Sequence, residues 1–211
     1  LWMGAIGPTL ILTALLIYAL PAMRPRATAP GDLVVRVDGE QFWWRVAYDP
    51  AGDLSPLLSA NEVRIPVGRT VVFELTARDV IHSFWIPGLA GKMDMIPGRT
   101  NRLVVQAEKS GRYRGVCAEF CGLSHALMAF DVIAMDATDF DAWLRRSRAA
   151  SAGAIASRGA TLFDAHGCGG CHAIRGTSHD ARIGPDLSRF GERRTMGAGI
   201  MPPTSANIAS F

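Results

Sequence analysis

The chain has 211 residues with 22 basic and 19 acidic side chains, which gives a formal net charge of +3. This length allows one or two domains beside a membrane segment. Basic and acidic residues are mixed along the chain, so we expect no nucleic-acid partner. The four cysteines occur as two pairs, and if both pairs hold cofactors, none is left for a structural disulfide.

The start of the chain is apolar. Residues 1–20 contain no charged side chain, and about twenty apolar residues in a helix span the core of a bilayer. A cleavable signal peptide is the alternative, but no basic segment precedes the run and no clear cleavage site follows it. We therefore expect a transmembrane helix over 1–23, kinked at most by Pro8, and then a linker over 24–32.

Short strand-like runs separated by turn residues fill residues 33–148. Two strands are expected within 33–48, on either side of a turn at Asp38 and Gly39. Further strands are expected at 62–66, 70–75, 82–86, 102–106, 112–116 and 127–135. Many short strands without a helix-length amphipathic segment between them indicate a mainly β fold, either an antiparallel barrel or a sandwich.

One loop between two predicted strands concentrates soft metal ligands. Cys117, Cys121, His125 and Met128 lie within twelve residues, and thiolate, imidazole and thioether groups suit copper. The cysteine pair alone also allows a disulfide, a zinc site or two buried thiols, and Met128 also fits the core of the following strand. Met128 favours copper, because zinc in proteins takes cysteine, histidine and carboxylate ligands rather than thioether.

The segment from His82 to Arg99, followed by Cys-x-Glu-x-Cys-Gly-x-x-His-x-x-Met at 117–128, resembles subunit II of haem–copper cytochrome c oxidases. The resemblance covers residues 1 to about 145 and implies a Greek-key cupredoxin domain over 33–148. In that family this domain carries a dinuclear copper centre, CuA. Subunit II usually has two transmembrane helices, and this chain resembles it from within the second.

The resemblance also implies the ligands of the copper centre. Cys117 and Cys121 would be bridging thiolates, His82 and His125 terminal imidazoles, and Met128 and the backbone carbonyl of Glu119 weak axial ligands. The Glu119 carboxylate would reach a magnesium ion shared with subunit I, and hard oxygen ligands suit Mg²⁺. Such a centre passes electrons, so we expect no catalytic residue on this chain.

An aromatic cluster, Phe42-Trp43-Trp44, precedes the predicted ligands. Strands are enriched in aromatic residues, so packing in the core is one explanation. The resemblance implies another, because the family usually has Trp-Tyr-Trp here and its first tryptophan receives electrons from cytochrome c. Phe42 stands in place of that tryptophan, and all three residues are candidates for receiving and relaying electrons.

A second domain is expected after the barrel. Thr138, with Asp141 three residues later, predicts the capped start of a helix, and the small residues at 149–156 predict a linker. The run at 168–172, Cys-Gly-Gly-Cys-His, is the signature of covalent c-type haem attachment.

In such a motif Cys168 and Cys171 form thioethers and His172 binds the iron, so 157–211 is interpreted as an all-α cytochrome c domain. His166 and His179 are interpreted as surface residues.

In small cytochromes c the second axial ligand of the haem is a methionine downstream of the attachment motif. Met196 and Met201 are the methionines that follow the haem motif. Resemblance to oxidases with a fused cytochrome places that ligand beyond a further helix. We therefore expect it beyond Phe211, with the cytochrome domain incomplete in this chain.

Together these features predict the electron-transfer subunit of a caa3-like, oxygen-reducing and proton-translocating oxidase. Electrons would pass from a donor such as cytochrome c or a bc-type or alternative complex to haem c, CuA and the haem of subunit I, where oxygen is reduced to water. Subunits I and III would be partners in the bacterial inner membrane, with both cofactor domains periplasmic.

Two other functions remain open on the sequence. A CuA-containing reductase of the nitrous oxide reductase type is disfavoured by the membrane helix and the fused haem. A non-catalytic copper-binding module would lack a large haem-bearing partner, whereas subunit II of a quinol oxidase would lack the copper ligands.

Overall fold

The computed structural model describes residues 2–21, 23, 28–49, 56–148 and 157–211. They fall into two compact units, Leu1–Pro30 and Gly31–Phe211, which are described separately. The predicted linker at 149–156 lies outside the described residues, as does part of the predicted linker at 24–32.

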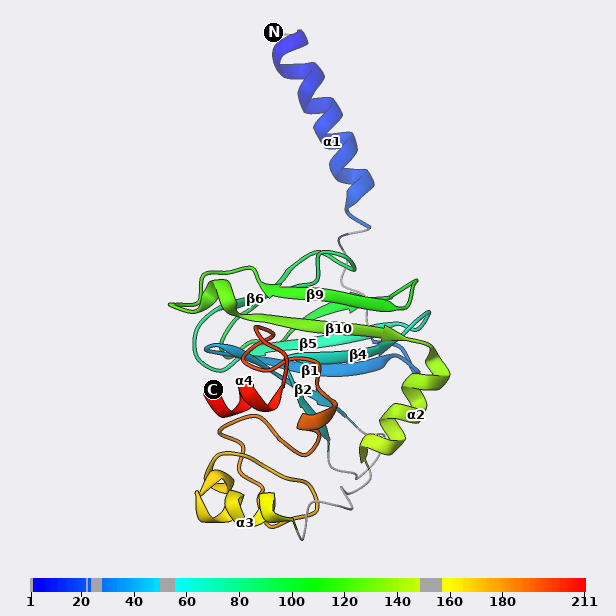
Figure 1. Cartoon of the computed structure of the whole chain (residues 1–211). Coiled ribbons are helices and arrows are strands. Elements are labelled where there is room, and N and C mark those ends of the chain that lie inside the picture. Colours follow the sequence, from blue (N-terminus) through cyan, green and yellow to red (C-terminus); the bar gives the residue numbers. More distant parts are fainter. Residues whose placement is uncertain (1, 22, 24–27, 50–55, 149–156) are drawn as a thin grey trace. The chain divides into compact units, whose positions relative to one another are not determined.

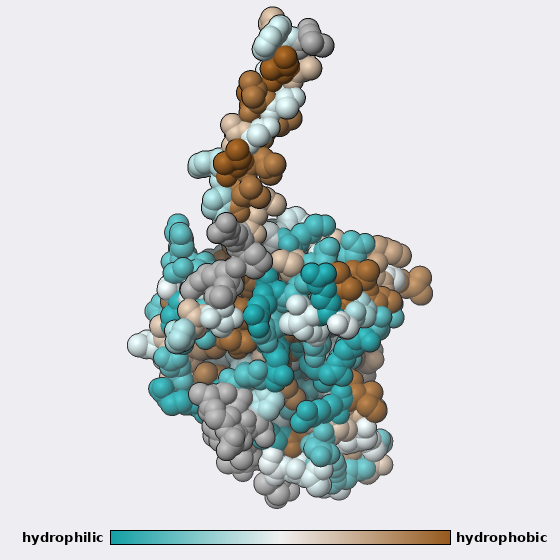
Figure 2. Space-filling model, turned by 180° about the vertical axis from the view of Figure 1, so that it is seen from behind, coloured by the Kyte–Doolittle hydropathy of each residue, from teal (hydrophilic) through white to brown (hydrophobic). Residues whose placement is uncertain are grey.

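The smaller unit is an apolar helix. A π-helical turn, Trp2–Ile6, leads into α1 (Gly7–Ala19), and Pro8 lies in the first turn of α1, where its missing N–H costs no hydrogen bond. The large apolar side chains of the helix are exposed (Figure 2). The span Trp2–Ala19 is long and apolar enough to cross a membrane, so the predicted helix is confirmed.

The larger unit is built on two five-stranded sheets (Figure 1). Their strand orders are β3-β2-β1-β5-β8 and β4-β10-β9-β6-β7. The strands are β1 (Leu33–Glu40), β2 (Trp43–Tyr48), β3 (Leu57–Ala60), β4 (Glu62–Pro66), β5 (Val71–Ala77), β6 (His82–Trp85), β7 (Met93–Met95), β8 (Asn101–Val105), β9 (Gly111–Cys117) and β10 (Ala129–Met135). The pairs β1–β5 and β4–β10 are parallel, and the other strand pairs are antiparallel. The arrangement is the mainly β, cupredoxin-like fold that the sequence predicted.

Aromatic side chains fill the core between the sheets. Trp44, Phe84 and Phe130 are fully buried, and the Trp44 ring lies edge-on to the other two at centroid distances of 5.5 and 5.1 Å. Phe84 stacks on Phe130 at 4.4 Å. Gly115 in β9 makes room, because a Cβ there would lie 2.1 Å from the Phe130 ring. This packing fixes β6, which begins at His82, against β9 and β10.

Two features of the predicted strands are wrong. The first turn lies at Gln41 and Phe42, because β1 continues through Asp38 and Gly39, and Gly39 pairs with Trp44. Gly39 serves close packing instead of a turn, since a Cβ there would lie 2.8 Å from the His82 ring. Strands β3 and β7, of four and three residues, were not predicted from the sequence.

A helix, α2 (Ala137–Arg148), follows the last strand. It places Trp143 edge-on to Tyr48 of β2 at a centroid distance of 5.3 Å. The predicted N-cap is wrong, because the Phe140 N–H already bonds to the Asp136 carbonyl and Thr138 lies inside the first turn.

The described residues after 156 form short helices joined by loops. They are α3 (Arg158–Ala165), the 3₁₀ turns Cys168–Gly170 and Phe190–Glu192, and α4 (Ser205–Ser210). The segment contacts the sheets directly. Arg45 of β2 donates to the Arg182 carbonyl at 2.8 Å, and the Arg194 N–H donates to Glu62 of β4 at 3.1 Å.

Candidate metal centre and haem-binding segment

The predicted copper ligands come from adjacent ends of two paired strands and from the loop that follows. His82 is the first residue of β6 and Cys117 the last of β9, and these strands pair in antiparallel register. The remaining ligands lie between β9 and β10, where His125 begins a 3₁₀ turn and Met128 directly precedes β10. A rigid sheet therefore fixes the first two side chains, and a short loop returns the others to them.

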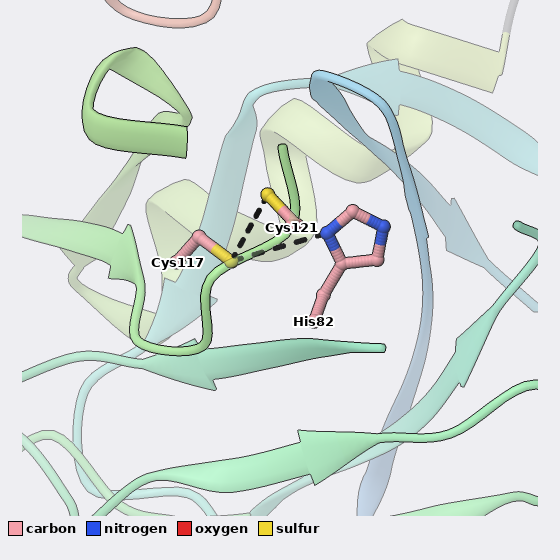
Figure 3. Close-up of side chains that lie close together, drawn as sticks. All are labelled: His82, Cys117 and Cys121. Atoms are coloured by element: carbon pink, nitrogen blue, oxygen red, sulfur yellow. Dashed lines mark hydrogen bonds between the residues drawn. The ribbon is translucent and has the colours of Figure 1, made fainter. Parts of the chain in front are cut away.

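The structure brings the predicted copper ligands together, and Figure 3 shows three of them, His82, Cys117 and Cys121. The two Sγ atoms lie 3.8 Å apart, Cys117 Sγ lies 3.9 Å from His82 Nδ1, and Cys121 Sγ lies 3.6 Å from His125 Nδ1. Met128 Sδ is 3.7 Å from Cys121 Sγ, and the Glu119 carbonyl is 3.2 Å from Cys117 Sγ. Two sulfurs flanked by an imidazole on either side, with a thioether nearby, form a donor set suited to soft metal ions.

The two thiols differ in their acidity. Burial raises the pKa of Cys117, but the hydrogen bonds from His82 and from the backbone outweigh burial and lower this pKa to about 6. Burial and the negative charge of the Cys117 thiolate raise the pKa of Cys121 to about 12. Near neutral pH the pair therefore keeps one proton, which a cation bound between the sulfurs would displace.

Asp79 lies behind the His82 imidazole and was not singled out from the sequence. Its Oδ1 is 2.9 Å from His82 Nε2, so the carboxylate holds that nitrogen as an N–H donor and orients the ring with Nδ1 toward the sulfurs. Burial raises the pKa of Asp79, but its hydrogen bonds, first that to His82, lower it overall. The spacing Asp-x-x-His at the start of a strand is the signal that could have found it.

The three aromatic residues of the predicted relay occupy different places. Trp44 is buried in the core, with its ring centroid 6.0 Å from that of His82. Phe42 and Trp43 are half-buried, and the Arg45 guanidinium lies 4.6 Å from the Trp43 ring centroid. Packing in the core thus explains Trp44 and leaves the other two at a surface of the sheets.

A cavity of about 760 Å³ lies between that surface and the haem motif. Residues of both domains line it: His172, Pro185, Phe190 and Met196 on one side, and Phe42, Trp43, Ser124 and Leu127 on the other. The lining is mainly apolar, and ligand cavities of this size and character hold molecules as large as a cofactor. Ser124 and Leu127 flank the predicted ligand His125. The loop at 117–128, which carries the predicted copper ligands and is called the copper loop here, therefore forms part of the wall.

The haem motif reaches this cavity through His172. His172 Nδ1 lies 2.7 Å from the Pro185 carbonyl, which makes Nδ1 the donor and leaves Nε2 free to bind a metal. Cys168 and Cys171 are free thiols, neither of them fully buried. These features fit a covalently bound haem.

The remaining predictions for this segment have mixed outcomes. His166 is exposed, as predicted. The His179 side chain is 26% exposed, and its Nε2 lies 2.7 Å from Asp164 Oδ1. Met196 lines the cavity and Met201 pairs with it through the backbone, while a second axial ligand beyond Phe211 stays a prediction.

Comparisons with known proteins agree with this geometry. The family described as cytochrome c oxidase subunit II, periplasmic domain, matches residues 49–135, and the cytochrome c family matches residues 156–204. Proteins named cytochrome c oxidase subunit 2 are 41% identical over 84% of this chain in Alkalihalophilus pseudofirmus and 32% identical over 97% of this chain in Bacillus subtilis. The chain spans 51% and 59% of the lengths of these two relatives.

A solved structure is similar as well. The periplasmic domain of subunit II of cytochrome oxidase from Bradyrhizobium japonicum aligns with a TM-score of 0.52 and 30% identity. The alignment covers 60% of this chain and 97% of that domain.

Proposed function

The chain belongs to the cytochrome c oxidase subunit II family, and we propose that it is the electron-transfer subunit of a caa3-like terminal oxidase. The observation that carries the proposal is that one compact unit holds both a converged set of copper-type donors and a cavity beside a Cys-x-x-Cys-His motif. Electrons would pass from haem c to CuA and on to the haem of subunit I, where oxygen is reduced to water.

The side chains of the metal centre would hold two copper ions. Cys117 and Cys121 would bridge them, His82 and His125 would be terminal ligands, and Met128 and the Glu119 carbonyl would be axial. Such a centre supplies a one-electron carrier that needs no change of ligands. The chain contributes rigidity, because β6 and β9 fix two of the ligands and Asp79 fixes the orientation of one imidazole.

The second cofactor would be haem c, held by thioethers to Cys168 and Cys171 and by His172. A haem supplies an iron that carries one electron. The chain would exclude water from it with the apolar wall of the cavity, and Phe42 and Leu127 would bring the copper domain up to its edge. Because both domains belong to one chain, their effective concentration is set by the linker and not by diffusion.

The surface around the copper loop supports a partner. Phe120 and Leu123 are 75% and 102% exposed and Trp85 is 37% exposed, and Figure 2 shows apolar side chains at this end of the unit. We assign this surface to subunit I, because clustered exposed apolar side chains mark interaction sites. The exposed Glu119 carboxylate could then share a magnesium ion with it. Subunit III is a further partner.

The protein would be anchored by its apolar helix in the bacterial inner membrane, with both cofactor domains on the periplasmic side. The upstream donor would be cytochrome c or a bc-type or alternative complex.

Purification of the full chain from membranes tests this function. We expect co-purification with a large haem-bearing subunit, together with oxygen uptake that stops when Cys117→Ser is introduced. Recovery of the chain alone, or turnover of nitrous oxide in place of oxygen, would contradict the proposal.

A further inference from the structure

The turn between β1 and β2 contacts the predicted copper centre from two directions. The Gln41 side-chain Nε2 donates to the Cys121 carbonyl at 2.6 Å, and the Gln41 backbone N–H donates to Asp79 Oδ2 at 2.7 Å. The other oxygen of Asp79 lies 2.9 Å from His82 Nε2. One residue is therefore linked both to a bridging cysteine and to the carboxylate that orients a terminal histidine.

Close packing accompanies these hydrogen bonds. Gly122, directly after Cys121, has a φ of +131°, and a Cβ there would lie 2.8 Å from Gln41 Nε2 and 3.1 Å from the Phe42 ring. The turn therefore rests on the backbone of the copper loop. Phe42 also lines the cavity beside the haem motif, so this turn touches the surroundings of both cofactors.

We propose that Gln41 is a positioning residue of the copper centre. Its hydrogen bonds connect Cys121 and, through Asp79, His82 to the turn between β1 and β2. This inference rests on the proposed function. The copper loop is joined to β6 near its start, where the Ala118 N–H donates to the Ser83 carbonyl, and the bond from Gln41 holds it further along, at Cys121. Groups that orient metal ligands without touching the metal alter affinity and spectra when they are removed.

The position of Gln41 makes the idea easy to test. Its side chain is exposed, so substitution removes no core packing. Gln41→Leu has a similar size, abolishes the bond to Cys121 and keeps the backbone N–H for Asp79. Gln41→Glu also removes the donor, because an ionised carboxylate accepts but does not donate, and it adds a negative charge facing the Cys121 carbonyl.

A matched control lies elsewhere on the same barrel. Gln106 is also an exposed glutamine whose Nε2 donates to a backbone carbonyl, that of Gly68, at 2.9 Å. Gln106→Leu therefore removes the same kind of bond with no connection to the predicted ligands.

The experiment uses the full chain with its haem attached, loaded with copper, and follows electron paramagnetic resonance and copper loss to a chelator. We expect both Gln41 variants to change the hyperfine splitting and to hold copper about tenfold more weakly, whereas Gln106→Leu matches the wild type. If both Gln41 variants match the wild type, the positioning role is wrong while the proposed function stands. If the wild type itself lacks a spin shared over two copper nuclei, the proposed function fails as well.

Discussion

The acidity of Cys117 is a direct consequence of its surroundings and can be measured without copper. A pKa of about 6 leaves about 90% of this thiol ionised near pH 7, against about 1% for a thiol with the ordinary value of 9.0. Titration of the copper-free, haem-loaded protein, followed by thiolate ultraviolet absorbance, should therefore show one ionisation near pH 6. In the haem-loaded protein Cys168 and Cys171 would be thioethers, which do not contribute to this absorbance.

His82→Gln tests the cause of the shift. Without the imidazole, the first of the hydrogen bonds that lower this pKa is lost while burial remains, so the Cys117 pKa should rise above about 6. The direction of the pKa shift also predicts how stability depends on pH. Because the pKa of Cys117 in the folded protein lies below 9.0, the thiolate stabilises the copper-free fold above pH 9. This contribution is lost as the pH falls through about 6. A first ionisation near 9 in the wild type, or one that stays near 6 in His82→Gln, would refute the reasoning.

Two further substitutions have matched controls. A Cβ at Gly169 would lie 2.1 Å from the His179 ring, whereas one at Gly170 meets nothing within 4 Å. Gly169→Ala should therefore lower the yield of attached haem, measured by haem staining of the denatured protein, and Gly170→Ala should not. Equal yields for the two variants would contradict this packing. Arg112→Ala removes the 2.7 Å partner of the fully buried Asp131 and should lower the free energy of unfolding by about 2 kcal/mol. Arg102→Ala breaks an exposed pair and should cost under about 1 kcal/mol; equal urea midpoints for the two variants would count against this account.

The sequence alone indicated that the candidate copper ligands lie close together. It did not indicate which other residues orient them. The donors lie in two short motifs, and their side chains are of the types that bind copper. Cys117, Cys121 and His125 could therefore be recognised without knowing the fold. Asp79 and Gln41 could not be recognised in this way, because their roles depend on which atoms the fold brings within 3 Å of them, the His82 imidazole for Asp79 and the Cys121 carbonyl for Gln41.

The errors in the fold have a similar origin. Asp38 and Gly39 have the composition of a tight turn, but tertiary packing decides otherwise, since Gly39 is the position where β1 passes the His82 ring. Local composition gives the number and type of most strands. It does not distinguish a glycine needed for a turn from one needed for close approach.

The measurement that tests the central claim most directly is electron paramagnetic resonance of the oxidised, copper-loaded chain at low temperature. The account predicts one unpaired electron shared over two copper nuclei, beside a low-spin haem signal. A signal from a single copper ion, or zinc in its place, would contradict the roles of His82, Cys117, Cys121 and His125 and favour a simple metal-binding module.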